Sequence, residues 1–339
     1  MTTLENQLEW KLRTMILGGS ISQFVTTLVQ LGIPDLIGDK KISINEIAST
    51  LYISKDKSHR LMKIGKSLEI FKEETPGFYA LTDMGELLQS NTLGSLKNYA
   101  SLKGQTWARQ SLSGLLPSLS SNESAFYNIF GQDVFSFLEH NQQSEQYHHS
   151  LSDISQYHDH KIVEAYNFEE VNSVTDVGAG LGSLLGNILT HNKHLKGVHF
   201  DQRSAVNAAE NSAYLRNIKD RCSFITGNFF SEVQTGTDVY ILKTILHDWN
   251  DEKAGEILSN IRNDINEKGR LLIIEIIMPE HDEVNIKTIM DLEMLIFYGG
   301  KERSLSEYNT LLENNGFKFN RVIPTNSDVS IIEAFPFKS

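Results

Sequence analysis

The alternation of short apolar segments with helical segments after residue 170 constrains the fold of this 339-residue chain more than any other feature. An apolar run followed by an amphipathic segment and a further apolar run predicts a β-α-β unit. Helices are expected between the runs, near 182–191, 203–215 and 251–265. The runs are SVTDVG, LKGVHFD, CSFITG, TDVYILK and RLLIIEIIM. This pattern predicts a parallel, doubly wound α/β sheet.

The C-terminal end of the chain adds two helices and two strands to this pattern. Helices are expected near 287–297 and 305–315, and the second begins with the capping box Ser304-Leu-Ser-Glu307. The segments FKFNRVIPT and VSIIEAFPF follow and are predicted to pair as a hairpin. Parallel strands that end in a hairpin-linked pair are typical of the Rossmann-like sheet of class I methyltransferases.

The N-terminal region has a different, mainly helical pattern. Residues 4–31 are predicted to form a helix with one apolar stripe. Helices with N-caps at Ser43 and Ser54 follow, and a small β-wing turns at Pro76-Gly77. The stripe consists of Leu4, Leu8, Leu12 and Met15. We interpret residues 1–100 as a winged-helix domain and expect the stripe to be buried in a homodimer.

A winged helix also suits a second function, which is DNA binding. The second helix of the motif carries Lys55, Lys57, His59, Arg60 and Lys63. Residues 1–100 nevertheless contain 11 basic and 11 acidic side chains, so the whole net charge of −12 lies in the remainder of the chain. DNA binding needs a net basic face. The charge therefore favours the dimerisation scaffold and disfavours a nucleic acid partner.

Composition narrows the cellular context. No run of 18 apolar residues is present, which disfavours a membrane partner. The first residues lack a basic segment and cleavage site of the secretory kind. Cys222 is the only cysteine, so we expect a cytoplasmic protein without disulfides. An acidic C-terminal half suits neutral or cationic small molecules better than polyanions.

The loop after the first strand of the sheet is the first candidate binding site. It reads Asp176-Val-Gly178-Ala-Gly180-Leu-Gly182, and glycines there let the backbone turn and approach a ligand. A dinucleotide fingerprint needs glycine at the position of Ser183. We therefore predict that Asp176, Gly178 and Gly180 bind S-adenosyl-L-methionine. A purely structural turn is the alternative.

The ends of the next strands carry further candidates for the same cofactor. Asp201 ends the second strand, where a carboxylate can accept both ribose hydroxyls. Asn228 is expected at the adenine edge, Phe229 at its face, and the stem of Lys243 along it. A solvated aspartate and core packing of the Phe229-Phe230 pair are the alternatives.

The fourth strand leads into LHDWNDE, which holds the candidate base. His247 would take the proton of an acceptor hydroxyl, and Glu275, at the end of the neighbouring strand, would accept the other ring N–H. A core histidine is one alternative. A metal site on His247, Asp248, Asp251 and Glu252 is another, although acids in the first turn of a helix suit the helix dipole.

The motifs DVGAGLG, DRCSFITGNFF, LKTILHDWNDE and GGKERSLSEYNTLLENNGF together resemble the caffeic acid-type O-methyltransferases. These comprise plant phenolic enzymes and bacterial tailoring enzymes, and the resemblance covers nearly the whole chain. It implies an N-terminal winged-helix dimerisation domain, no metal, and a catalytic group in which Glu275 and Glu302 flank the base His247. This chain departs from the family at Ala179, at Gln202-Arg203 and at Asn228.

The acceptor is expected to be a flat aromatic molecule with a phenolic hydroxyl. Residues 101–165 are predicted to be a helical linker that also covers the acceptor pocket, and residues 166–339 form the catalytic domain. The predicted pocket residues are Phe135, Tyr147, Met290, Asp291, Met294 and Phe297. Two rival functions stay open: a metabolite-sensing DNA-binding regulator, and a family member recruited to chemistry without methyl transfer.

Overall fold

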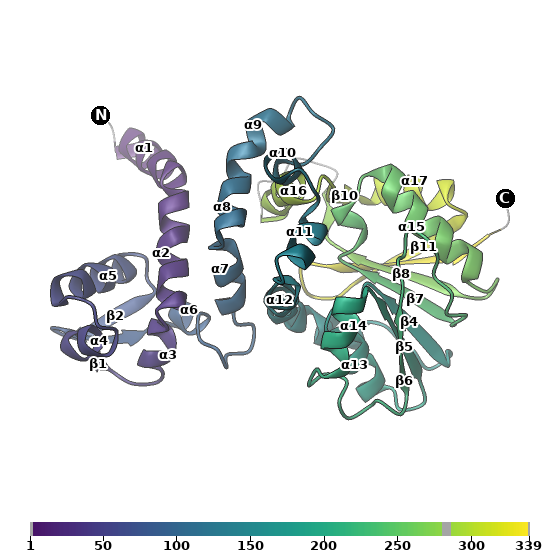
Figure 1. The fold of residues 1–339 in the computed structure, drawn as a ribbon, viewed down its shortest axis with the longest axis horizontal. Coiled ribbons are helices and arrows are strands. Elements are labelled where there is room, and N and C mark those ends of the chain that lie inside the picture. The colour runs from purple at the N-terminus through teal and green to yellow at the C-terminus, as the bar shows by residue number, and fades with distance from the viewer. Residues whose placement is uncertain (1–2, 280–285, 338–339) are drawn as a thin grey trace. The chain divides into compact units, whose positions relative to one another are not determined.

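The computed structural model describes residues 3–279 and 286–337 (Figure 1). Contacts within the chain divide it into two compact units, residues 1–109 and 110–339. The finer predicted division, with a separate linker over 101–165, stays a prediction. Among the described residues, no helix is long and apolar enough to cross a membrane, and the expected cytoplasmic location stays a prediction as well.

The first unit contains the predicted winged-helix elements. Ser43 and Ser54 cap α4 and α5 as expected, because their side chains accept from the backbone amides of Glu46 and Lys57. The predicted helix over 4–31 is interrupted at Leu17 and forms two helices. The small sheet has the strand order β1-β3-β2. The elements are α1 (Thr3–Ile16), α2 (Gly18–Gln30), α3 (Ile33–Ile37), β1 (Ile42–Ser43), α4 (Ile44–Thr50), α5 (Lys55–Ser67), β2 (Phe71–Thr75), β3 (Phe78–Leu81), α6 (Asp83–Glu86) and α7 (Lys97–Lys103), and the division between the units falls within α8 (Thr106–Ser111).

The apolar stripe of α1 is exposed where the structure describes its side chains. Leu8, Leu12 and Met15 are 61%, 58% and 64% exposed. The side chain of Leu4, predicted to belong to the same stripe, lies outside the described part of the chain. Trp10, at 70%, is also exposed on this helix. Leu8, Leu12 and Met15 lie on one face of α1, and an exposed apolar stripe of this kind marks an interaction site.

The second unit is built on a sheet of seven strands, in the order β11-β12-β8-β7-β4-β5-β6 (Figure 1). The pairs among β4 to β8 are parallel, and β12 runs antiparallel to β8 and β11, so the predicted sheet and hairpin are confirmed. The strands are β4 (Ser173–Val177), β5 (Lys196–Asp201), β6 (Cys222–Thr226), β7 (Val239–Lys243), β8 (Arg270–Glu275), β11 (Phe317–Pro324) and β12 (Ser330–Pro336), and a separate pair consists of β9 (Ile277–Met278) and β10 (Arg303–Ser304).

Helices cover both faces of this sheet. Along β7, Val239 and Ile241 pack in one core with α12 and α13, whereas Tyr240 and Leu242 pack in the other with α15 and α17. This alternation explains the nearly continuous apolar run of the strand. The helices are η1 (Leu112–Gly114), α9 (Leu115–Ser118), α10 (Ala125–Phe130), α11 (Val134–His140), α12 (Ser144–Ala165), α13 (Ser183–His191), α14 (Arg203–Glu210), η2 (Leu246–Asp248), α15 (Asp251–Asp264), α16 (Ile286–Phe297) and α17 (Leu305–Asn314).

Candidate active site

The segment after β7 forms a tight turn that places His247 at the carboxyl edge of the sheet. Thr244 has a φ of +51°, which redirects the chain into η2. Glu275, the last residue of β8, stabilises this turn, because its Oε1 accepts from the amides of Ile245 and Leu246, both at 3.0 Å. The buried carboxylate at the end of β8 thus fixes the backbone turn that follows the neighbouring strand β7.

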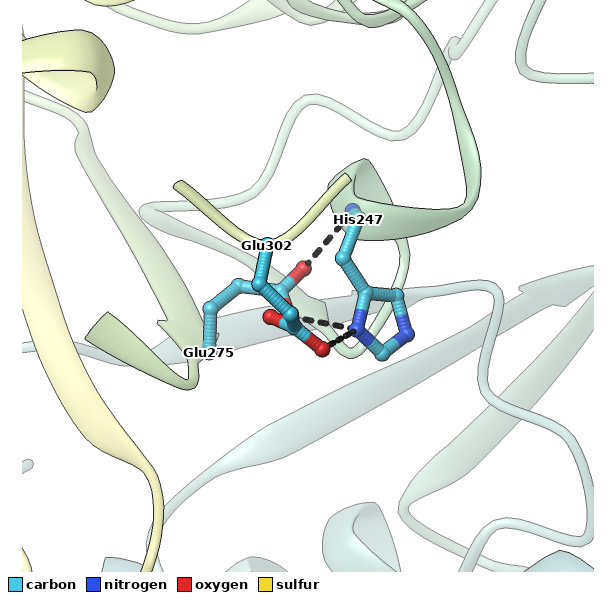
Figure 2. A group of neighbouring side chains, drawn as sticks. All are labelled: His247, Glu275 and Glu302. Atoms are coloured by element: carbon cyan, nitrogen blue, oxygen red, sulfur yellow. Dashed lines mark hydrogen bonds and ion pairs between the residues drawn. The ribbon is translucent and has the colours of Figure 1, made fainter. Parts of the chain in front are cut away.

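The imidazole of His247 is held by a second glutamate. Its Nδ1 lies 2.8 Å from Glu302 Oε1 and 3.5 Å from Glu275 Oε2, and Figure 2 shows this edge of the ring facing both carboxylates. A carboxylate only accepts, so Nδ1 carries a proton and the neutral ring has its lone pair on Nε2. Both predicted glutamates lie at this edge of the ring, and Glu302 rather than Glu275 is the hydrogen-bond partner of Nδ1. Oε1 of Glu275 instead accepts from the backbone of the turn, and its Oε2 faces the ring at ion-pair distance.

The short parallel pair of β9 and β10 brings Glu302 to this place. Arg303, the first residue of β10, pairs with Ile277 of β9, two residues after Glu275. Glu302, directly before β10, is thereby brought close to Glu275 at the end of β8. Asp291 on α16 supports Glu302, since its Oδ1 accepts from the Glu302 amide at 2.8 Å. This contact gives Asp291 a supporting role beside the one predicted for it in the acceptor pocket.

Arg303 is a residue of the site that sequence reasoning missed. Its side chain is fully buried. Its guanidinium donates to the carbonyl oxygens of Leu246 and Trp249, both at 2.7 Å, and to Asp251 Oδ1 at 2.9 Å. Arg303 therefore ties the segment that contains Glu302 to both sides of the His247 turn. The planar, five-donor geometry of arginine suits this role.

Gly300 allows the same two segments to approach. A Cβ at this position would lie 2.0 Å from the carbonyl oxygen of His247 and 2.6 Å from the amide of Trp249. No side chain fits there. The glycine of GGKER is thus required by the contact with LHDWNDE.

The charges around His247 alter its proton affinity. Burial disfavours the charged ring, but the carboxylates of Glu275, Asp248 and Glu302 outweigh it and raise the pKa of His247 to about 10. Burial raises the pKa of Glu275 to about 7 and that of Asp248 to about 7. Asp248 Oδ1 lies 3.6 Å from Nε2, on the side of the ring opposite Glu302. The imidazolium form is therefore strongly stabilised by its surroundings.

The glycine loop after β4 lies against the His247 turn. Gly178 has a φ of +77°, and a Cβ there would lie 2.4 Å from Ile245. The Gly180 amide donates to Asp201 Oδ2 at 2.8 Å, and His199 Nε2 lies 2.9 Å from the Gly180 carbonyl oxygen, to which it donates. A Cβ at Gly180 would meet nothing within 4 Å. The loop is thus fixed on its sheet side and open on the other.

Two other predicted cofactor residues have protein partners of their own. Asn228 is exposed, and its Oδ1 accepts from the Phe230 amide at 3.0 Å. Phe229 packs edge-on against Phe230 with ring centroids 4.8 Å apart, and both are partly buried against a core of the sheet. The ammonium of Lys243 donates to Asp159 and Ser155 on α12.

Asp176 lies at the carboxyl end of β4 and is 3% exposed. Burial raises its pKa to about 7, which Lys243 opposes and the carboxylates of Asp159 and Asp201 reinforce. The four residues therefore lie close enough for their charges to interact. Asp176, Lys243, Asp201 and the glycine loop come together at one edge of the sheet, as predicted.

Aromatic rings gather beside the His247 turn. The Phe135 ring stacks on Trp249 at 5.8 Å and lies 5.7 Å from Tyr298, and the hydroxyls of Tyr147 and Tyr298 are 2.7 Å apart. The charge of Asp248 acts on Tyr147, whose pKa burial raises far above its usual range. Of the other predicted pocket residues, Met294 and Phe297 are buried, and Met290 is half-buried and packs against a core of the sheet.

The residues whose ligand atoms lie close enough to share a metal ion are not the set His247, Asp248, Asp251 and Glu252 considered from the sequence. One ligand atom each of His247, Glu275 and Glu302 lies within 4.8 Å of the others. Asp251 instead accepts from Arg303. The expectation that the site works without a metal stays a prediction.

Known proteins resemble both units of the chain. Residues 116–318 match the O-methyltransferase domain family, and residues 14–91 match the O-methyltransferase dimerisation domain family. The chain is 34% identical to the phenazine O-methyltransferase PhzM of Lysobacter antibioticus, over 95% of this chain and 94% of that protein.

Two solved structures extend the comparison. The crystal structure of LaPhzM has a TM-score of 0.91 and 34% identity, covering 97% of this chain and 99% of that one. An O-methyltransferase from neocarzinostatin biosynthesis, solved with S-adenosylmethionine and 2-hydroxy-5-methyl naphthoic acid, has a TM-score of 0.79 and 26% identity, covering 94% and 96%.

The seven-strand sheet, the glycine loop and the histidine at the sheet edge define a class I methyltransferase with an N-terminal helical domain. The chain belongs to the O-methyltransferase family with an N-terminal dimerisation domain, and it is an S-adenosylmethionine-dependent O-methyltransferase. The resemblance seen in the sequence motifs is confirmed.

Proposed function

We propose that this enzyme methylates a hydroxyl of a small aromatic molecule, with His247 as the general base. The observation that carries the proposal is the hydrogen bond of 2.8 Å between His247 Nδ1 and Glu302. It leaves Nε2 as the only ring nitrogen that can take a proton from an acceptor. The names of relatives point to aromatic acceptors, since one is a phenazine O-methyltransferase. Another relative was solved with a naphthoic acid.

The charges around His247 favour the form of the ring that this role produces. A phenol has a pKa of about 10, and the carboxylates that raise the pKa of His247 make its neutral ring a stronger base toward that hydroxyl. Glu275, Glu302 and Asp248 stabilise the imidazolium that forms. Transfer of the proton to Nε2 converts neutral phenol and imidazole into phenolate and imidazolium, and the phenolate is the stronger nucleophile.

The residues at the sheet edge fit S-adenosylmethionine. When bound, this cofactor supplies an electrophilic methyl group on a sulfonium. Gly180 leaves open space above the loop. Asp201 accepts from the Gly180 and Gln202 amides and would also receive the ribose hydroxyls. Asp176 and Gly178 complete the loop, and the contact of Gly178 with Ile245 keeps it beside the His247 turn.

We further propose that Asn228 and Phe229 hold the adenine, as predicted. Asn228 is exposed. Its side-chain oxygen, which accepts from the Phe230 amide, has a second lone pair that can accept from the adenine amino group, and its NH₂ can donate to a ring nitrogen. The acceptor would lie among Phe135, Tyr147 and Trp249, whose rings favour a flat aromatic guest. Met290, Asp291, Met294 and Phe297 on α16 belong to the same proposed pocket.

The proposed assembly is a homodimer through the N-terminal unit. The exposed stripe side chains Leu8, Leu12 and Met15 on α1 support it, as does the match of residues 14–91 to a dimerisation domain family. Light scattering at micromolar concentration should give twice the mass of one chain. A stable monomer would overturn the proposal.

Mass spectrometry tests the activity itself. The purified protein is incubated with S-adenosylmethionine and a library of phenols, matched aromatic amines and aromatic acids. A phenol should gain one methyl group, and added EDTA should leave the rate unchanged. Loss of carbon dioxide or gain of oxygen without methylation would support the rival chemistry, and a gel shift on DNA at low salt would support the regulator.

A further inference from the structure

The imidazole of His199 on β5 contacts the glycine loop and has no role in the chemistry assigned to His247. The His199 side chain is fully buried. Its Nε2 lies 2.9 Å from the carbonyl oxygen of Gly180, which only accepts, so Nε2 carries the ring proton. Its Nδ1 is buried and has no hydrogen-bond partner among the described residues. The contact with Gly180 therefore requires one tautomer of a neutral ring.

The surroundings of His199 hold the ring in this form. The ring lies against Phe224 on β6, with centroids 5.5 Å apart. Its Cδ2 is 3.4 Å from the place that a Cβ on Gly182 would take, so the ring also packs against the end of the loop. Burial lowers the pKa of His199 and outweighs the hydrogen bond to Gly180 and the charge of Asp201, which raise it. The ring thus keeps one proton for one acceptor.

Side chains of β5 bind both polar groups of Gly180. The amide of Gly180 donates to Asp201 Oδ2 at 2.8 Å, and its carbonyl oxygen accepts from His199. The preceding contact, from the amide of Gly178 to the carbonyl oxygen of Phe200 at 2.8 Å, is made by backbone alone. Only the contacts of Gly180 therefore depend on the identity of the residues in β5.

Gly180 is also the part of the loop that a ligand can reach. It is partly exposed, has a φ of +56°, and a Cβ there would meet nothing within 4 Å. A glycine in this region has more conformational freedom than any other residue. The Gly182 amide donates to the Ala179 carbonyl oxygen at 2.9 Å and closes a turn around Gly180. Without His199, the carbonyl of Gly180 would lose its partner inside this turn.

We propose that His199 is a positioning residue for the cofactor, because its Nε2–H holds the Gly180 peptide in the conformation that receives S-adenosylmethionine. The inference rests on the proposed function and adds to it a buried residue that does not touch the ligand. A histidine that only stabilises the core of the sheet is the alternative to be separated by experiment.

Two variants of His199 separate these roles. His199→Leu removes the donor, whereas His199→Gln keeps an N–H donor at the end of its side chain. We expect His199→Leu to bind S-adenosylhomocysteine about three- to tenfold more weakly in a calorimetric titration, the range that one neutral hydrogen bond contributes. His199→Gln should recover most of this affinity. The kcat of both variants at saturating cofactor should stay within about twofold of the unaltered enzyme, because His199 does not act on the acceptor.

His194→Leu is the matched control. His194 also donates from Nε2 to backbone carbonyl oxygens, those of Phe168 and Val171, but it lies before β5, at the opposite end of the strand from Asp201. This variant should leave the affinity for S-adenosylhomocysteine unchanged. Hydrogen exchange gives a second measurement, since the Gly180 amide should exchange faster in His199→Leu than in the control.

The outcomes are distinct. Unchanged affinity and unchanged Gly180 exchange in His199→Leu, with only a lower melting temperature, would overturn the proposal and leave a core histidine. If this variant does not fold, ¹⁵N NMR of the unaltered protein decides: Nε2 should carry the proton, and its exchange with water should slow when S-adenosylhomocysteine binds. A ring protonated at Nδ1, or an exchange rate that the ligand leaves unchanged, would overturn the proposal. An unaltered protein that does not bind S-adenosylhomocysteine would refute the proposed function instead.

Discussion

The variant Glu302→Gln tests how the site sets the proton affinity of His247. Glutamine keeps the size of the side chain and removes a negative charge 2.8 Å from Nδ1. Hydrogen bonds to charged groups contribute about 1.5–3 kcal/mol, roughly twice as much as neutral ones. Losing that difference costs the imidazolium at least about 1 kcal/mol, and 1.36 kcal/mol corresponds to one pH unit.

The sign of the change follows from the direction of the shift. The carboxylates raise the pKa of His247 by favouring its charged form, so removing one of them lowers that pKa by about one pH unit. The acidic limb of kcat/KM, which reports the free enzyme, should therefore move to lower pH. The rate above this limb should fall about tenfold, because the imidazolium formed during transfer loses the same stabilisation.

The assay is the initial rate of methylation of a phenolic acceptor across the accessible pH range. Glu256→Gln provides the control, since that side chain is partly exposed on α15 and pairs with Lys253. Its profile should match the unaltered enzyme. An acidic limb that stays in place in Glu302→Gln, or moves to higher pH, would contradict the proposed role of Glu302.

Three further predictions concern the residues around the base and the cofactor. Arg303→Lys should lower kcat by about tenfold or more with little change in the affinity for S-adenosylhomocysteine, because one ammonium cannot span its three partners; steady-state kinetics with calorimetry would show whether binding falls instead. Gly300→Ala should lower the melting temperature by several degrees, since its Cβ overlaps the His247 carbonyl oxygen; an unchanged melting curve would show that the two segments separate easily. Asn228→Asp should tighten cofactor binding a few-fold and leave kcat nearly unchanged, through a charged hydrogen bond to adenine; equal or weaker binding in a titration would remove Asn228 from the proposed adenine site.

Much of the fold was predictable because it follows from local patterns. The apolar runs from β4 to β8 gave the parallel sheet, and the box at Ser304 and Glu307 gave the start of α17, where both hydrogen bonds of the box are present. The helix expected over 203–215 ends earlier, with α14 at Glu210. The following Asn211 and Ser212 are residues that favour turns over a helix interior.

The arrangement of the site was less predictable, because it depends on contacts between distant segments. His247 and Glu275 could be placed at neighbouring strand ends. The direct bond to Glu302 depends on β9 and β10, each of two residues and too short to show a pattern. Arg303 was missed for a related reason: a charged residue near a loop is usually solvated, and its burial emerges only when the sheet has formed.

The most direct test of the account is the rate of methyl transfer by His247→Ala in a single turnover, with cofactor and a phenolic acceptor both saturating. If His247 takes the acceptor proton, the rate should fall by at least about 10²-fold, while S-adenosylhomocysteine binds as tightly as to the unaltered enzyme. A variant that retains most of its rate on a phenol would show that no base at this position is needed.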